Sequence, residues 1–354
     1  MSVVTKRQLF LCCLATTLLT WLLGCNGPHP TTPAAESGPN LLVTTQGTVE
    51  LKREGWRGYV PVAFGTVIRW GDLIRPSTGQ VVTIICADLT LRTVDQESGC
   101  PCQPGTLPVL TYGGTHLLAP RGATSDIPYI LYPRNTAILD DQPLLRWHAT
   151  GASSYTVAIV RGGRTFWQQA GVSGTELHYP ADAPTLQPGI DYLLSVTDEN
   201  TSRRSSEDPA KGLGFQLLSE AQRSKVEAQR DAILALSVDE PARQFVLAVY
   251  YAGQGLRGEA LMLLDTLTAT IDTPAIYLWR GDLLLATQLP TEATEAYQSA
   301  LNSAEALGDV ESQAAAHAGL WRAMGDEAYF DQAVTLYEVL GDTAAVAALR
   351  EEHP

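Results

Sequence analysis

Three cysteines in the body of the chain have the type and spacing to do chemistry. Cys86 precedes Cys100 and Cys102 by 14 and 16 positions. A disulfide from Cys86 to either partner closes a loop of about 15 residues and stabilises the fold by ~3 kcal/mol in the chain-entropy model. The third thiol then stays unpaired. A three-cysteine metal site completed by His116 is the alternative, but the chain lacks a second cysteine pair with zinc spacing, so we expect no metal.

A search for catalytic groups gives no motif. The histidines do not form an H-E-x-x-H or a comparable ligand pattern, and the chain contains no G-x-S-x-G, phosphate-loop or S-x-x-K sequence. The Cys100-Pro101-Cys102 pair lacks the helix N-terminus that lowers a thiol pKa. We therefore expect a protein that is not an enzyme, with no catalytic residue and no cofactor. The six histidines are His29, His116, His148, His178, His317 and His353.

The first 24 residues have the pattern of an export signal. Lys6 and Arg7 give a positive start, and an apolar run follows from Leu9 to Leu23. The run ends in Leu22-Leu23-Gly24-Cys25, which resembles the lipobox of bacterial lipoproteins. The resemblance implies a signal peptide over residues 1–24 that is cleaved before Cys25, whose thiol carries the lipid. An N-terminal membrane anchor that is never cut is the alternative.

Residues 25–40 are rich in Pro, Thr, Ser and Gly and predict an extended tether. We therefore expect a bacterial cell-envelope protein, anchored to the membrane by its N-terminal lipid and facing the periplasm or the exterior. Such an oxidising compartment favours pairing of two of the three remaining thiols. Cleavage changes the formal charge from −14 to −16, with 22 basic against 38 acidic side chains, and this acidity argues against a nucleic-acid partner.

Residues 41–118 alternate apolar and polar residues in short runs separated by Gly and Pro, which predicts a small all-β sandwich or barrel. Within this region Gly65-Thr66-Val67-Ile68 is followed by Gly71-Asp72-Leu73-Ile74. This pair of glycine turns resembles the FecR-like domain, in which the second turn precedes a pair of strands. The resemblance concerns the fold and implies no chemistry.

A second β module is predicted over residues 126–217. Trp147 ends a strand-like run, and the stretch Leu186-Gln187-Pro188-Gly189 leads to Tyr192. This stretch resembles the tyrosine corner of fibronectin type III and Ig-like sandwiches, which implies that the phenol hydrogen-bonds back to the turn. Trp147 and Tyr192 are therefore expected in a core. The remaining candidates for a sugar-stacking surface are Trp56, Trp70 and Trp167.

From residue 218 to 354, Ala, Leu, Glu and Gln dominate and the apolar period becomes helical. Segments spaced by 33 positions superpose, with Ala260 matching Ala293, and a longer unit around Ala333 follows. This pattern resembles the tetratricopeptide (TPR) repeat and implies three helix pairs, with a flanking helix at each end. The predicted fold class is therefore multidomain, with two all-β modules followed by an all-α, TPR-like solenoid. The matched positions are Leu247, Ala248, Tyr251, Gly255, Ala260, Leu264 and Leu267 with Arg280, Gly281, Leu284, Gln288, Ala293, Tyr297 and Ala300.

The helical third carries most of the acidity, with 8 basic against 21 acidic side chains in residues 217–354. If the resemblance holds, the first helix of each pair lines a groove that takes a protein or peptide partner. The expected function is that of a non-enzymatic adaptor that binds a partner through the helical domain. A cell-envelope protein that binds a glycan or another ligand through its β modules is the alternative. The groove candidates by spacing are Phe245, Val249, Leu278, Asp282 and Leu285.

The lipid anchor predicts the outcome of one substitution. Cys25→Ser removes the only thiol that the lipidation pattern uses, so the chain should move from the membrane fraction to the soluble fraction. Fractionation of cells followed by immunoblotting measures this shift, with Cys100→Ser as the control. An unchanged distribution of the Cys25→Ser chain would show that the membrane attachment has another cause.

Overall fold

Eight short strands form the first β module in the computed structural model, which describes residues 38–44, 49–108, 110, 126–210 and 213–353. They make two four-stranded sheets, in the orders β4-β1-β6-β7 and β3-β2-β5-β8. Alternating apolar side chains of both sheets fill the core between them, as the period of two predicts. The strands are β1 Asn40–Leu42, β2 Val49–Lys52, β3 Val60–Val62, β4 Val67–Ile68, β5 Leu73–Pro76, β6 Val82–Ile85, β7 Leu91–Val94 and β8 Ser98–Gly99.

The second β module has a five-stranded and a three-stranded sheet, in the orders β10-β16-β15-β12-β13 and β14-β11-β9. Trp147 and Tyr192 lie in its core, as predicted. The Gln187 N–H donates to the Tyr192 hydroxyl at 2.9 Å, the hydrogen bond to the turn that the sequence implies. The strands are β9 Ile130–Tyr132, β10 Thr136–Ile138, β11 Leu144–Trp147, β12 Tyr155–Arg161, β13 Arg164–Val172, β14 Glu176–His178, β15 Tyr192–Asp198 and β16 Phe215–Leu217.

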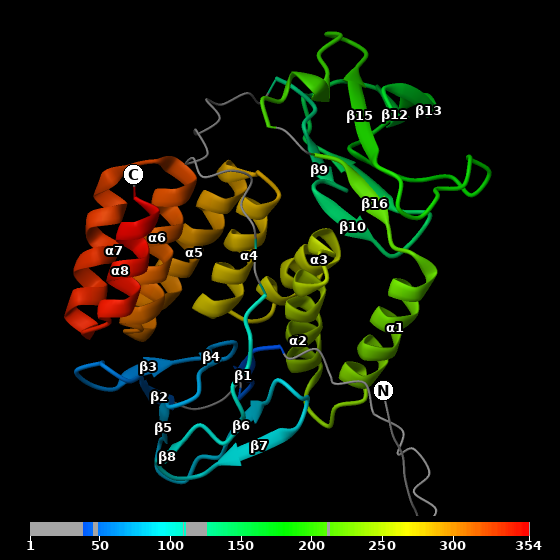
Figure 1. The fold of residues 1–354 in the computed structure, drawn as a ribbon. Helices are drawn as coiled ribbons and strands as arrows, with labels where there is room; N and C mark the ends of the chain where they lie inside the picture. Colours follow the sequence, from blue (N-terminus) through cyan, green and yellow to red (C-terminus); the bar gives the residue numbers. More distant parts are fainter. Residues whose placement is uncertain (1–37, 45–48, 109, 111–125, 211–212, 354) are drawn as a thin grey trace, which may run out of the picture. The chain divides into compact units, whose positions relative to one another are not determined.

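Eight helices follow in the described part of the chain, which gives the predicted order of β modules and then a helical stack (Figure 1). Their boundaries follow from capping, because Ser219, Asp239, Asp309 and Asp342 each accept a backbone N–H in the first turn that follows. The helices are α1 Glu220–Leu234, α2 Glu240–Gly253, α3 Arg257–Thr268, α4 Pro274–Ala286, α5 Pro290–Leu307, α6 Val310–Met324, α7 Glu327–Leu340 and α8 Thr343–Glu352.

Small residues let the helices of the stack approach closely. Ala260 and Ala293 are fully buried, as expected for residues at helix crossings. The Tyr297 ring of α5 lies against Gly281 of α4 and Gly319 of α6, where an added Cβ would come within 2.6 and 2.3 Å of ring atoms. Because these glycines leave room for the ring, α4, α5 and α6 pack around one tyrosine.

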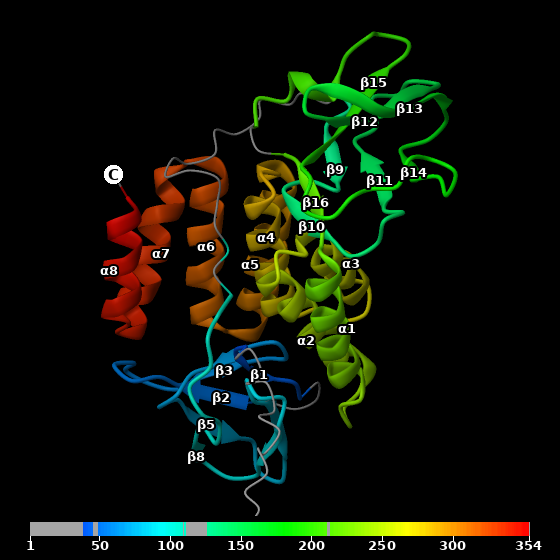
Figure 2. The same cartoon turned by 45° about the vertical axis from the view of Figure 1, so that its right-hand side comes forward.

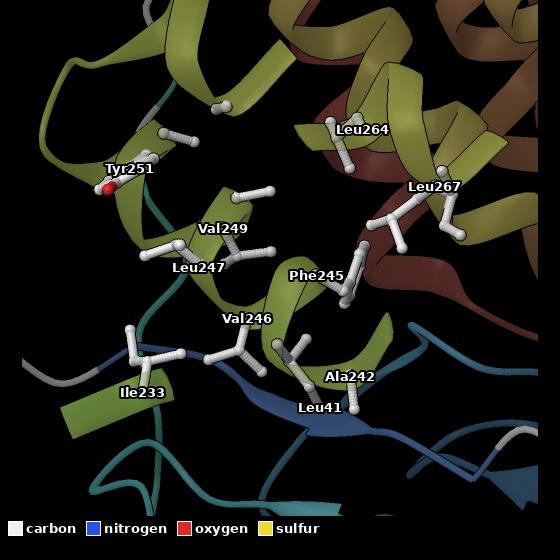
Figure 3. Packing of buried hydrophobic residues seen from close by; sticks show 14 of the residues in the cluster. Leu41, Ile233, Ala242, Phe245, Val246, Leu247, Val249, Tyr251, Leu264 and Leu267 are labelled. Atoms are coloured by element: carbon white, nitrogen blue, oxygen red, sulfur yellow. The ribbon is translucent and has the colours of Figure 1, made fainter. Parts of the chain in front are cut away.

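The first β module shares a core with the helices. Leu41, Phe64 and Ile85 belong to the same hydrophobic cluster as Phe245 of α2 and Ile276 of α4. Figure 3 shows Leu41 beside Val246 and Phe245 in this cluster. The shared core makes the first β module and the helices one packed body, rather than separate modules joined by linkers.

The first β module meets the N-terminal ends of the first helices of the pairs. Gly65 lies against Ala275 in the first turn of α4, and Arg53 pairs with Glu311 in the first turn of α6. The Trp56 indole N–H donates to the Asp342 carboxylate at the start of α8, at 3.1 Å. Figure 2 shows β1, β2, β3 and β5 at one end of these helices. The module therefore covers helix starts contributed by residues more than 200 positions away in the sequence.

The second β module is fixed to the stack by Arg134, which is 1% exposed. Its guanidinium donates to the carbonyls of Thr287 and Gln288 at 2.6 and 2.9 Å, just after α4, and to the Asp208 carboxylate at 2.9 Å. The neighbouring Asn135 amide donates to the Ala286 carbonyl at 2.8 Å. These hydrogen bonds satisfy carbonyls that the end of α4 leaves without helical partners.

No helix among the described residues is both long and apolar enough to cross a membrane. The predicted signal peptide (residues 1–24), Cys25 and nearly all of the tether (25–40) lie outside the described residues. The same is true of His116.

The Arg134 contacts predict a large loss of stability on substitution. Arg134→Met leaves the buried Asp208 carboxylate and two carbonyls without this cation, so the free energy of unfolding should fall by about 3–5 kcal/mol. Chemical denaturation of the folded chain measures the change.

Arg146→Met is the matched control, because the exposed Arg146–Glu176 pair, 3.9 Å apart, should contribute less than about 1 kcal/mol. Equal losses for the two variants would contradict the role assigned to Arg134.

Candidate functional site

A cleft of about 300 Å³ lies between the first β module and the helices α4 and α6. We call it the inner cleft. The β module contributes Arg53, Arg69 and the turn at Gly65, and the helices contribute apolar and acidic side chains. Both charge signs and an apolar wall therefore face one space. The helix residues that line the inner cleft are Ala275, Leu278, Trp279, Asp282, Glu311, Ser312 and Ala315.

Arg53 organises the β-module side of the inner cleft. Its guanidinium is almost fully buried and pairs with the carboxylates of Asp72, at 3.4 Å, and Glu311. It also donates to the Val67 carbonyl at 2.8 Å and lies over the Trp56 ring. Burial, and secondarily the charge of Arg69, lowers the pKa of Arg53 to about 10, so the group stays cationic at neutral pH.

Two acids of the cleft region are held by the chain itself. Burial raises the pKa of Asp72, and the opposing charge of Arg53 and the Arg69 N–H at 2.7 Å lower it in part. On the helix side, the Asp282 carboxylate accepts a hydrogen bond from the Tyr297 hydroxyl at 2.6 Å. These contacts fix the cleft's charged groups before any ligand arrives, which reduces the entropy lost on binding.

The five predicted groove residues fall in two environments. Leu278 and Asp282 line the inner cleft. Phe245 is completely buried, with its ring 5.4 Å from that of Phe64, and Val249 is in the same core. Leu285 is buried among α4, α5 and α6. The first β module is what covers Phe245, so this residue is core in the described structure and presents no surface to a partner.

Two of the three cysteines form a disulfide, and it is one of the two pairings that the sequence predicts. Cys86 is bonded to Cys102, with Cα atoms 5.4 Å apart, and Cys100 keeps a half-buried free thiol. Burial raises the pKa of the Cys100 thiol, so this group is a poor nucleophile at neutral pH. In the described ranges, no three His, Cys, Asp or Glu side chains are placed to hold a metal ion.

The three tryptophans that could stack on a sugar differ in their exposure to solvent. Trp56 is buried in the core of the first β module, and Trp167 packs edge-on against Tyr179. Trp70 is 62% exposed. Of these three rings, Trp70 is the most exposed and Trp167 is half-buried.

Glu259 is a buried acid that the sequence did not reveal as special. Its carboxylate lies at the start of α3, where it accepts hydrogen bonds from the Tyr132 hydroxyl at 3.3 Å and the Leu139 N–H at 3.1 Å. Burial raises its pKa from an ordinary 4.5 to about 7. A buried acid with such a pKa is often catalytic. Glu259 does not line the inner cleft; its hydrogen bonds join the start of α3 to the second β module.

Comparison with protein-family models and with curated proteins finds no match to this chain. The resemblances to FecR-like, fibronectin type III-like and TPR-like domains therefore stay predictions. Arg53, Arg134 and Glu259 are the residues that the sequence analysis missed, because each acquires its role from partners far away in the sequence.

Glu259 predicts a pH dependence of stability. Between pH 4.5 and 7 the folded chain keeps a proton that the unfolded chain releases. The stabilisation from this proton is full below about pH 4.5 and is lost as the pH rises through 7, so the free energy of unfolding should fall by up to about 3 kcal/mol. Glu259→Gln, which keeps an acceptor oxygen, should remove this part of the dependence.

Chemical denaturation at pH 5 and pH 8 measures the difference between the native chain and the variant. Glu220→Gln, on the exposed first turn of α1, should retain the native dependence. If Glu259→Gln retains it as well, another group is responsible.

Proposed function

We propose that this chain is a membrane-anchored, extracytoplasmic bacterial lipoprotein that acts as a non-enzymatic adaptor. The lipid anchor at Cys25 and the tether follow from the N-terminal sequence. The adaptor role follows from the helical domain and its resemblance to TPR repeats, whose inner face binds peptide segments. The observation that carries the proposal is the inner cleft, because it lies on the first helices of two adjacent pairs.

The partner that fits the inner cleft is an extended protein segment with one apolar anchor and charges of both signs. Leu278, Trp279 and Ala315 offer an apolar wall for the anchor. Arg69 is exposed and can pair with an acidic side chain, while Asp282 can pair with a basic one. The excess of acidic residues on the helical third would attract a basic partner at long range.

The two β modules have a different task in this proposal. They hold the stack at both ends of α4, through Ala275 at its start and through Ala286 and Thr287 at its end. A rigid stack keeps the inner cleft at one width, which favours a specific partner over many weak ones.

Ala315→Glu tests the proposal with little risk to the fold. Ala315 is half-buried on α6 and lines the inner cleft, so a glutamate there fills the cleft with a charged chain while keeping helix propensity. We expect the partner recovered with the chain to fall by about tenfold or more. The measurement is affinity purification of the full lipidated chain from detergent-solubilised envelopes of its native cells, quantified by mass spectrometry.

Ala347→Glu is the matched control, since Ala347 is exposed on α8 and away from the cleft. If Ala315→Glu leaves partner recovery unchanged and a substitution elsewhere in the chain abolishes it, the inner cleft is not the partner site. The full chain is required because the helices share a core with the first β module, so residues 217–354 alone would expose that core.

A further inference from the structure

A second cavity, of about 350 Å³, lies between the first β module and the helices α1 and α2. We call it the apolar cavity. Its volume is in the range of small-molecule sites in proteins, which begins near 300 Å³. It lies next to the disulfide, because Cys86 is among its lining residues. The aliphatic side chains of its lining are Leu41, Ile85, Leu89, Leu107, Ile233, Val246 and Val249.

Among the described residues, the lining of the apolar cavity contains no charged side chain. This contrasts with the helical third around it, where acidic residues are frequent. Of the described lining residues Tyr250 alone is aromatic, and Gln229 and Gln254 supply uncharged amides. Moving a charged ligand out of water into such a space is costly, whereas a neutral aliphatic ligand gains from the burial.

Leu89 is held in an unusual backbone conformation beside this cavity. Its φ is +64°, in the left-handed region that Gly and Asn adopt readily and that leucine rarely adopts. The turn is fixed by the Leu89 N–H, which donates to the Cys86 carbonyl at 2.8 Å. Backbone strain of this kind persists where the surrounding structure holds it, and here it places an aliphatic side chain in the lining.

We propose that the apolar cavity binds a single acyl chain of a neutral lipid. The aliphatic lining matches the chain, and the lack of charge matches an ester or hydroxyl head rather than a carboxylate. The source is a lipid separate from the protein. The lining begins at Gly38, which is 13 positions after Cys25, so a chain anchored there keeps the cavity within about 45 Å of the membrane. This last step rests on the proposed lipid anchor.

The test uses the mature chain from residue 25 with Cys25→Ser, which lacks the lipid and keeps every described residue. The neutral fluorescent probe N-phenylnaphthylamine should bind at one saturable site, and monolauroylglycerol should displace it. No saturable binding, or binding that monolauroylglycerol does not displace, would overturn the proposal.

Two variants test whether the probe binds in the apolar cavity, and neither removes a fully buried side chain. Leu89→Asn suits the left-handed backbone and puts an amide into the lining, and Gln229→Glu adds a charge to it at nearly constant shape. Each should weaken probe binding by about tenfold, while Gln298→Glu on the exposed face of α5 should leave it unchanged. Normal binding by both cavity variants would show that the probe binds elsewhere.

The lipidated chain separates the two sources of an acyl chain. If the lipidated chain in detergent binds the probe as the Cys25→Ser chain does, the cavity is open to a separate lipid. If lipidation alone blocks the probe, the occupant is the protein's own anchor and the proposed source is wrong. Ala315→Glu does not alter the lining of this cavity, so failure of the adaptor proposal leaves this result unaffected.

Discussion

The buried guanidinium of Arg134 is the contact on which the second β module's position depends. It joins the carbonyls of Thr287 and Gln288 to the Asp208 carboxylate. Gln288 has a φ of +58°, the conformation that Gly255 adopts at the corresponding turn of the preceding pair. Gly255 and Gln288 are the residues that the 33-position spacing matches. Because a non-glycine residue is strained in this region, the hydrogen bonds from Arg134 stabilise a turn that the local sequence would not favour.

The first β module is attached to the stack at the opposite end of the helices. Gly65, at a φ of +90°, brings the backbone against Ala275 and Phe245, where any Cβ would collide. Arg53 then neutralises the acidic start of α6 through Glu311. A helix N-terminus already favours negative side chains, and Arg53 ties the module to the start of α6 through one of them. The inner cleft and the apolar cavity both lie between the first β module and the helices.

Local patterns predicted much of the fold. Ala260 and Ala293 marked close crossings, and Tyr192 with its turn marked a sandwich core. The disulfide was limited to two pairings. The site was less predictable, because spacing alone assigned Phe245 to an open groove. Nothing in the sequence shows that Phe64, 181 positions earlier, packs over its ring.

The same long-range contacts restrict what the acidic helical third can do. A solenoid with free ends could open and close. Its acidic surface would then attract any nearby basic chain without selectivity. Here both ends of α4 are tied to β modules that precede it in the sequence, so the inner face is accessible through the inner cleft rather than along its whole length. In the proposed adaptor role, charge steers a partner toward the stack, and the fit to Leu278, Asp282 and Arg69 selects which partner stays bound.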